Sequence, residues 1–230
     1  MAAPSTARAR AKKVRRVFLL SPARVDGVRA GAILNPMACF PLAQRFHSDG
    51  LPLADVFAFT SGLYFRGKIT YARAFAHPEA GDVVRVITSN AGLAAPSRRL
   101  DPDGLRAFGE VPIDPAEPRY HEPLRRDARA LARRLADDGV AILLGSIATA
   151  KYRDVLLECF GERLVFPSAF VGRGDMSRGG LLLRAARAGV ELDYAAVAGA
   201  VVRGRRPPRL APLAAPRARG RRGAGLTLRE

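Results

Sequence analysis

The chain has 230 residues, of which 38 are Lys or Arg and 21 are Asp or Glu, so its formal net charge at pH 7 is +17. Its longest nearly apolar run, residues 140–150, is shorter than the roughly 18 residues that cross a bilayer, and two cysteines without C-x-x-C spacing exclude a disulfide scaffold. The apolar stretch behind the basic N-terminus is too short for a signal peptide, so we expect a cytoplasmic protein with no membrane partner.

Most of the positive charge lies near the two ends of the chain. Residues 1–16 carry six basic side chains and no acid, residues 203–230 carry nine arginines and one acid, and the stretch between them is close to neutral. We therefore expect one α/β domain over residues 17–202, with a basic disordered arm before it and a disordered tail rich in Arg, Pro and Gly after it. Such a layout is typical of a protein that meets a polyanion. Arginine outnumbers lysine 34 to 4, so compositional drift is an alternative origin of these charges.

Short β-rich segments occur in chain order at residues 17–20, 83–88, 140–144 and 163–166. Each of the first three is followed by small or hydroxyl residues and then by a helical pattern, which predicts an α/β fold with a small, mostly parallel sheet flanked by helices. The carboxyl ends of parallel strands share one edge of a sheet, and ligands of open α/β sheets bind there. We therefore expect the loops after the first three strands to converge on one crevice.

The segment 25–78 is longer than a simple crossover needs and predicts an inserted helical hairpin subdomain. Within it, residues 56–69 indicate a helix, a glycine-containing turn and a second helix. A turn of this kind exposes backbone N–H groups that can hold a phosphate, and basic side chains follow it in the sequence. A plain helical hairpin that packs through Phe57 and Phe65 is an equally good interpretation.

Three further helices are predicted from the spacing of apolar residues. These residues recur every three or four positions over residues 119–138 and again over residues 149–159, which indicates one buried stripe on each helix. Residues 177–189 are apolar on nearly every side. That pattern predicts an interior helix.

The densest polar cluster of the sequence lies directly before the last of these helices. Gly174 allows a tight turn, Ser177 can cap the helix, and Arg173 and Arg178 lie near its positive end. Cations at a helix N-terminus are unfavourable unless an anion is present, so we expect a phosphate or carboxylate to bind here. An ion pair of one of these arginines with Asp175, which would lock the loop, is the alternative.

The sequence lacks the common motifs for cofactors and metals. Neither a Walker A motif nor G-x-G-x-x-G follows a strand, and the histidines have no H-E-x-x-H or C-x-x-C partners. Ser146 follows the third strand as a nucleophile would, but it lacks the G-x-S-x-G context and has no assigned base. We therefore expect no cofactor and no metal ion.

Four stretches, in the same order, resemble the YaaA-type peroxide-stress family. The family's strand followed by S-P-A-K resembles residues 17–24, and its A-F-x-G-x-x-Y-x-G-L stretch resembles residues 58–67 with one residue extra. Its S-D-E-Y resembles residues 150–152, and its A-R-G-x-M-[SA]-R resembles residues 172–178, the most specific of the four. The family's S-G-L-Y-G-x-L-x-P is reduced at residues 89–96, so the chain is similar to a divergent member.

The resemblance implies a compact α/β core like that of uracil-DNA glycosylases, a helix-hairpin-helix element that contacts DNA, and a role in protection from oxidative damage. We therefore expect a DNA-binding protein that contacts the nucleic-acid backbone with little sequence preference. The expected DNA contacts are Tyr64, Arg66, Gly67, Lys68, Arg173 and Arg178.

Two other classes of function stay open. One is an enzyme that acts on a nucleobase, a nucleoside or another small anionic metabolite in the crevice, and the other is a binding protein without catalysis. The sequence does not assign a nucleophile and a base, so whether the chain is catalytic is undecided. The expected ligand or phosphate contacts are Ser21, Arg24, Ser89, Asn90, Ser146, Lys151, Tyr152, Arg173, Gly174, Ser177 and Arg178.

Overall fold

The computed structural model describes residues 13–202 and 204–210. Within these residues six strands form one sheet in the order β4-β3-β1-β6-β7-β8. The strands β3, β1, β6 and β7 are parallel, and β4 and β8 pair antiparallel at the two edges. Their bounds are Val14–Leu20 (β1), Val83–Ile87 (β3), Leu93–Ala94 (β4), Leu135–Leu144 (β6), Leu164–Pro167 (β7) and Tyr194–Ala196 (β8). The expected α/β fold with a small, mostly parallel sheet is confirmed.

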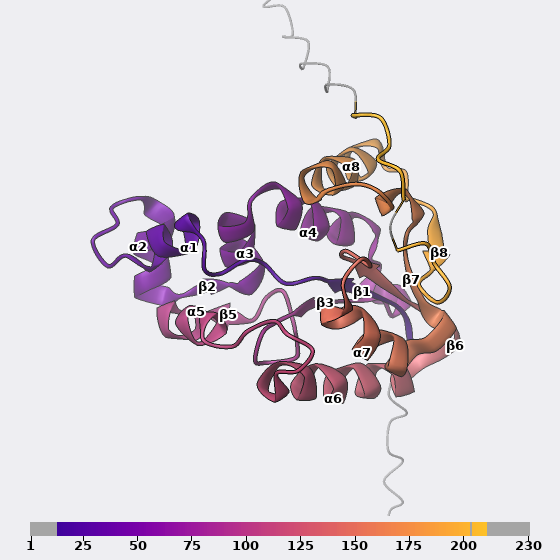
Figure 1. Cartoon of the computed structure of the whole chain (residues 1–230). Coiled ribbons are helices and arrows are strands. Elements are labelled where there is room, and N and C mark those ends of the chain that lie inside the picture. The colour runs from indigo at the N-terminus through magenta and orange to yellow at the C-terminus, as the bar shows by residue number, and fades with distance from the viewer. Residues whose placement is uncertain (1–12, 203, 211–230) are drawn as a thin grey trace, which may run out of the picture.

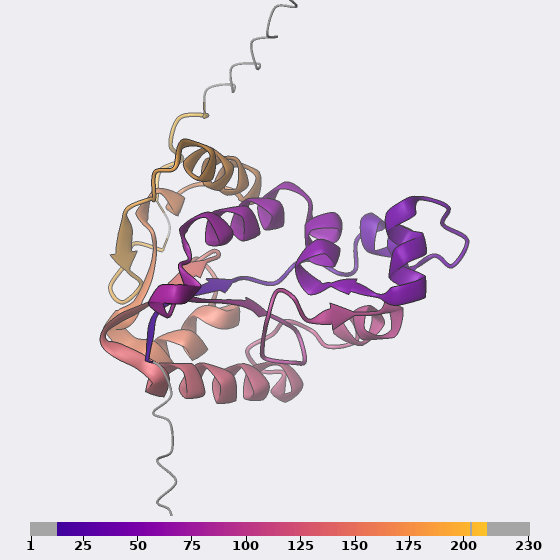
Figure 2. The ribbon, with the colours of Figure 1, turned by 180° about the vertical axis from the view of Figure 1, so that it is seen from behind.

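Helices cover both faces of this sheet, as Figures 1 and 2 show. On one face lie α4 (Leu63–Phe75) and α8 (Asp175–Ala188), and on the other lie α6 (Pro118–Arg134) and α7 (Ala150–Phe160). Residues 17–20 of β1 and 141–144 of β6 are all buried. Continuous burial of this kind is typical of parallel strands between two helical layers, and it explains their unbroken apolar sequence.

The segment between β1 and β3 is mostly helical, as the sequence predicts. It contains α1 (Val28–Leu34), α2 (Pro41–Asp49), α3 (Leu53–Ser61), α4 and the short η1 (Pro78–Ala80). It also contributes the strand β2 (Leu51–Pro52), which pairs with β5 (Arg99–Leu100) ahead of α5 (Pro102–Gly109). The short helices η2 (Gly161–Arg163) and η3 (Ser168–Phe170) flank β7.

The predicted helical hairpin is present as α3, Gly62 and α4. Gly62 joins the two helices with φ at +61°, a conformation that glycine adopts without strain. The rings of Phe57 on α3 and Phe65 on α4 pack edge to face with 5.4 Å between their centroids.

Two of the predicted helices differ from those observed. The helix expected over residues 119–138 ends at Arg134, because Leu135 already pairs with Val14 in the sheet. Apolar spacing does not distinguish the last apolar turn of a helix from the first residue of a buried strand. The helix expected in the interior, α8, lies at the surface, and the residues it buries are Arg178, Gly179, Leu182 and Ala185.

The folded part also extends beyond the predicted domain bounds. The strand β1 begins at Val14, so Arg16 belongs to the sheet and not to a basic arm. Residues 204–210 lie against the loop before α8, where the Arg173 Nη1 donates to the Pro208 carbonyl oxygen at 3.4 Å. The rest of the two expected arms, residues 1–12 and 211–230, lies outside the described residues.

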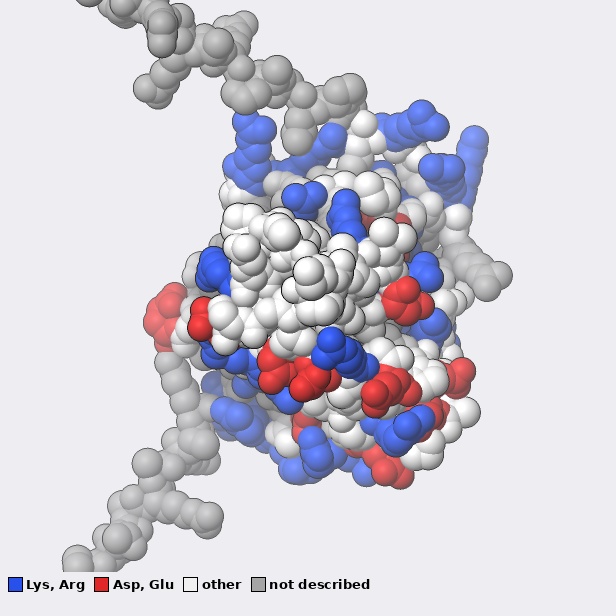
Figure 3. All heavy atoms as spheres, turned by 90° about the vertical axis from the view of Figure 1, so that its left-hand side faces the viewer, with Lys and Arg blue, Asp and Glu red and all other residues white. Residues whose placement is uncertain are grey.

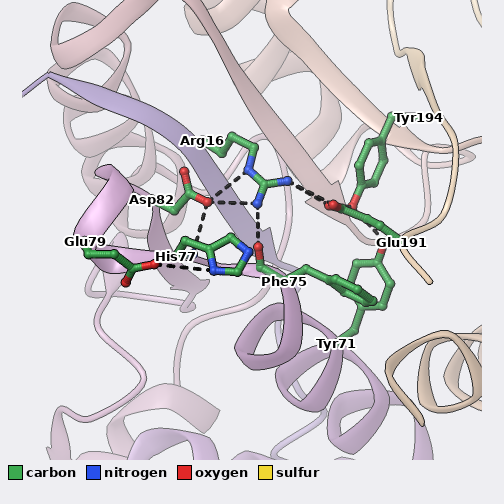
Figure 4. A network of polar contacts seen from close by, with 8 residues as sticks. All are labelled: Arg16, Tyr71, Phe75, His77, Glu79, Asp82, Glu191 and Tyr194. Carbon is green, nitrogen blue, oxygen red and sulfur yellow. Dashed lines mark hydrogen bonds and ion pairs between the residues drawn. The ribbon is translucent and has the colours of Figure 1, made fainter. Parts of the chain in front are cut away.

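An ion-pair network ties the start of β1 to neighbouring segments (Figure 4). The Arg16 guanidinium donates to Asp82 and Glu191, each at 2.9 Å, and also to the carbonyl oxygen of Phe75. The Tyr194 hydroxyl donates to Glu191 at 2.6 Å. Burial alone would lower the pKa of Arg16, but the two carboxylates outweigh it and raise that pKa. Arg16 therefore stays charged and holds β1, the end of α4 and the segment before β8 together.

The helices α4 and α8 cross at a contact between two glycines. A Cβ on Gly179 would lie 2.8 Å from the Leu63 carbonyl oxygen and 2.8 Å from the Tyr64 Cα, and a Cβ on Gly67 would lie 2.6 Å from the Gly179 carbonyl oxygen. The two backbones therefore touch, and a side chain at either position would separate the helices.

We expect Gly179→Ala to lower the free energy of unfolding by about 1–3 kcal/mol, because the added methyl group meets backbone that cannot move aside cheaply. The matched control is Gly180→Ala, whose new Cβ meets only the Leu210 side chain at an ordinary 3.5 Å. The control should be neutral or slightly stabilising, because alanine favours helix more than glycine does. Urea unfolding of both variants measures the difference, and equal stabilities would refute the close crossing.

Candidate functional site

A pocket opens beyond the carboxyl ends of β1 and β6, where the sequence predicts a crevice. Its volume is about 560 Å³. The loop after β1, the start of α4, the loop after α5 and the starts of α7 and α8 contribute to its walls. The residues that line it are Ser21, Pro22, Ala23, Arg24, Val25, Asp26, Ser61, Tyr64, Phe108, Gly109, Val111, Pro112, Ile113, Ser146, Lys151, Tyr152 and Asp175.

At one wall of the pocket a serine, a lysine and a tyrosine meet. The Lys68 Nζ donates to the Ser21 Oγ at 2.8 Å and to the Ser21 carbonyl oxygen at 2.6 Å. Tyr152 lines the same pocket beside Ser21, and its hydroxyl accepts the backbone N–H of Ser146 at 2.8 Å. We call Ser21, Lys68 and Tyr152 the Ser–Lys–Tyr cluster.

The fold brings the three side chains together from separate elements. Ser21 follows directly on β1, and its backbone N–H donates to the Leu144 carbonyl oxygen of β6 at 3.2 Å. Gly145 leaves room for Ser21 and Tyr152, because a Cβ at position 145 would lie 2.8 Å from the Ser21 Cβ and 2.9 Å from the Tyr152 hydroxyl. Lys68 lies on α4 next to Gly67, whose backbone contacts Gly179 of α8.

Lys68 is almost completely buried, with 1% of its surface exposed. Its Nζ lies 4.5 Å from the centroid of the Tyr64 ring and 4.9 Å from that of Phe65. Among the described residues, no carboxylate lies within ion-pair distance of this amine. Burial therefore lowers the pKa of Lys68 to about 7, which the more distant Asp175 opposes only in part.

The two pocket tyrosines are also perturbed by burial. Burial raises the pKa of Tyr152, and the nearby Ser21 hydroxyl and the hydrogen bond from the Ser146 N–H act in the opposite direction. It raises the pKa of Tyr64 too, and within the described residues the Tyr64 hydroxyl has no hydrogen-bond partner of ordinary geometry. Both phenols therefore stay protonated at neutral pH.

The rim of the pocket is charged, whereas part of its wall is apolar. Lys151 is exposed at the rim, and Arg24, also exposed, pairs with Asp26 at 2.7 Å. Phe108 and Ile113 supply apolar surface. This arrangement can take a small molecule that has both an apolar part and an anionic group.

Five of the predicted ligand contacts come together in this pocket: Ser21, Arg24, Ser146, Lys151 and Tyr152. The two predicted from the second strand do not line it. The Ser89 Oγ donates to the Phe108 carbonyl oxygen at 2.7 Å, and the Asn90 side chain donates to the Ala107 carbonyl oxygen at 2.9 Å. Both side chains hold the end of α5 in place instead of facing a ligand.

The anion site predicted before α8 is not open in the structure. Arg178 is buried, its Nε donates to the Phe170 carbonyl oxygen at 3.3 Å, and its Nη1 contacts Asp175 at 3.4 Å. The Arg173 Nη1 donates to the Ser177 Oγ at 3.2 Å. The two guanidinium groups thus hydrogen-bond within the loop itself, as the alternative interpretation expected. Gly174, which precedes α8, has a φ of −81°, a conformation that any residue can adopt.

Most of the predicted DNA contacts on α4 are wrong for a simple steric reason. Tyr64, Gly67 and Lys68 are buried, because they face α8 and the sheet. Only Arg66, among the predicted positions of this helix, is exposed.

The sequence reasoning missed Lys68 as the partner of the pocket residue Ser21, although a signal for it exists. Tyr64, Lys68, Tyr71 and Phe75 recur at spacings of four, three and four, and all are buried on α4. A lysine on the apolar stripe of a helix therefore marks a cation that the fold takes out of water.

No protein-family model, no curated protein and no solved structure matches the chain. Within the described ranges, no helix is long and apolar enough to cross a membrane. In the same part of the chain, no group of three or more His, Cys, Asp or Glu side chains gathers as a metal site would require.

Proposed function

We propose that this protein binds DNA through the sugar-phosphate backbone, with little sequence preference. The observation that carries the proposal is an arginine-rich surface over α8 and the segment 204–210. We call this surface the α8 face. Its arginines are Arg184, Arg187, Arg205, Arg206 and Arg209.

These arginines belong to one region, because the segment 204–210 lies against α8. The Pro208 carbonyl oxygen accepts a hydrogen bond from Arg173, and Leu210 lies beside Gly180. In Figure 3 the upper part of the molecule, where α8 lies, carries basic side chains with little acid, whereas both signs mix in the lower half. Arg66 and Arg73, exposed on the neighbouring α4, add to the same sign of charge.

The sequence continues this charge pattern. Residues 211–230, which lie outside the described residues, contain five arginines and one acid. Guanidinium groups pair with phosphate oxygens and release counterions from DNA, a source of affinity that does not depend on base sequence. The resemblance to the YaaA-type peroxide-stress family also favours DNA as the partner, and we include protection of DNA under oxidative stress in the proposal.

The test is fluorescence-anisotropy binding to a labelled DNA duplex at salt concentrations from about 50 to about 200 mM. We expect steep salt dependence for the full chain. The variant Arg187→Gln/Arg205→Gln/Arg206→Gln should bind about tenfold or more weakly and show a shallower salt slope, because each lost phosphate contact removes about 0.9 from that slope.

The matched control removes the same charge from α6, on the other face of the sheet, as Arg126→Gln/Arg133→Gln/Arg134→Gln. It should lose much less affinity than the α8-face variant. Equal losses would mean generic polycation behaviour without a defined face, and an absence of binding at low salt would refute the proposal.

A further inference from the structure

The Ser–Lys–Tyr cluster has the composition of a reactive site and not of a structural ion pair. A buried lysine that only stabilises a fold is normally paired with a carboxylate. Lys68 instead contacts a hydroxyl, a carbonyl oxygen and two aromatic rings, and its hydroxyl partner lines a pocket. When this amine is neutral, it can accept the Ser21 hydroxyl proton along the same 2.8 Å contact while it still donates to the Ser21 carbonyl oxygen.

We propose that Ser21 is a catalytic nucleophile, that Lys68 is its general base, and that the pocket hydrolyses a small ester or amide that carries an anionic group. This inference is independent of DNA binding by the α8 face. The 2.8 Å separation of the Ser21 Oγ from the Lys68 Nζ is within the range that direct proton transfer requires.

The reaction divides into two steps. In the first, the Ser21 Oγ forms a bond to the carbonyl carbon of the substrate while its proton passes to the neutral Lys68 amine. The tetrahedral intermediate collapses, the bond to the leaving group breaks, and the leaving group takes the proton from the Lys68 ammonium. In the second, water attacks the acyl-serine with Lys68 again as the base, the acid is released, and the Ser21 Oγ regains a proton. The sum is hydrolysis of the ester or amide by one water molecule.

The protonation equilibrium of Lys68 suits this role. A pKa of about 7 leaves a large fraction of the amine neutral at physiological pH. The titratable and charged groups around the cluster are Tyr64 on the same helix, Tyr152 on α7, and Asp175 and Arg178 at the start of α8. Both phenols are protonated there, so the proton that moves near neutral pH is the one on Lys68.

The lining of the pocket points to the class of substrate. The charged lining residues are Arg24, Lys151, Asp26 and Asp175. Arg24 pairs with Asp26 and Asp175 pairs with Arg178, so the exposed ammonium of Lys151 is the group that can bind a carboxylate or phosphate of the substrate, and Phe108, Val111 and Ile113 favour an apolar acyl or leaving group beside it. We therefore assign the pocket to small anionic acyl compounds.

The test is covalent labelling of the full chain with phenylmethylsulfonyl fluoride and with an alkyl fluorophosphonate. In each case the Ser21 Oγ displaces fluoride, which leaves as hydrogen fluoride, and peptide mass mapping locates the adduct. We expect a single adduct on Ser21, with a labelling rate that rises with pH around a midpoint near the Lys68 pKa of about 7. Ser21→Ala should abolish the adduct, and Lys68→Met should slow labelling by about 100-fold or more.

The control is Ser168→Ala, an exposed serine that is not among the residues lining the pocket, which should label like the parent. Labelling of the unaltered protein decides the matter even if the pocket variants fold poorly. An adduct on another residue, or no adduct at high probe concentration and alkaline pH, would overturn the inference. Neither outcome changes the anisotropy result, so the two proposals fail separately.

Discussion

Replacement of Arg16 by methionine is expected to lower the free energy of unfolding by about 3–5 kcal/mol. Methionine keeps an apolar stem of similar length but removes the cation that Asp82 and Glu191 face. The Asp82 side chain is only 3% exposed, so the variant leaves a buried carboxylate without its partner. Urea unfolding followed by far-ultraviolet circular dichroism measures the loss.

The neighbouring residue on the same strand provides the control. Arg15 pairs with Asp138 at 3.5 Å, but the two side chains are 62% and 74% exposed. Arg15→Met should therefore change the unfolding free energy by less than about 1 kcal/mol. Similar losses in the two variants would show that the network of Figure 4 contributes no more than a surface ion pair.

Lys68→Met is expected to change how stability depends on pH. The pKa of Lys68 falls from 10.5 in the unfolded chain to about 7 in the folded protein. Between these values the unfolded state binds one proton more than the folded state, so stability rises with pH. Relative to the Met variant, the parent should gain on the order of 1 kcal/mol per pH unit across this window and be least favoured below about pH 7.

The measurement is urea unfolding of both proteins at a series of pH values from about 6 to about 10. Lys151→Met is the control, because Lys151 is exposed at the rim of the pocket and its removal should leave the pH dependence of the parent unchanged. Parallel curves for the parent and the Lys68 variant would show that the buried amine keeps its proton across this window.

Much of the fold could be predicted from local sequence patterns. Each of the four parallel strands contains a short, mostly apolar run rich in Val, Ile, Leu or Phe. Such runs are recognisable because helices cover both faces of the sheet. The two edge strands, β4 and β8, and the strands β2 and β5 were missed, because two or three residues carry no periodicity. The surface position of α8 was missed because small residues such as Gly179 make a helix look uniformly apolar, whereas here they allow close contact with α4.

Those residues of the candidate site that directly follow a strand could be predicted from the sequence. Ser21 and Ser146 follow strands that end at the same edge, so topology brings them together. The contact between Ser21 and Lys68 depends on how closely α4 packs against the sheet. No local sequence pattern gives that packing distance. The anion site before α8 was predicted from the charge of two arginines, and the structure uses them to hold the loop through Ser177 and Asp175.

Position 68 is a lysine in a chain whose other basic residues are almost all arginines. The chain fills 34 of its 38 basic positions with arginine, yet the most deeply buried cation among its described residues is a lysine. A guanidinium would keep its proton even there, because its intrinsic basicity exceeds what burial can overcome. A buried lysine ammonium, in contrast, can lose its proton. The surface arginines thus keep their positive charge at any physiological pH. The protonation state of the Lys68 amine, in contrast, can change with its surroundings.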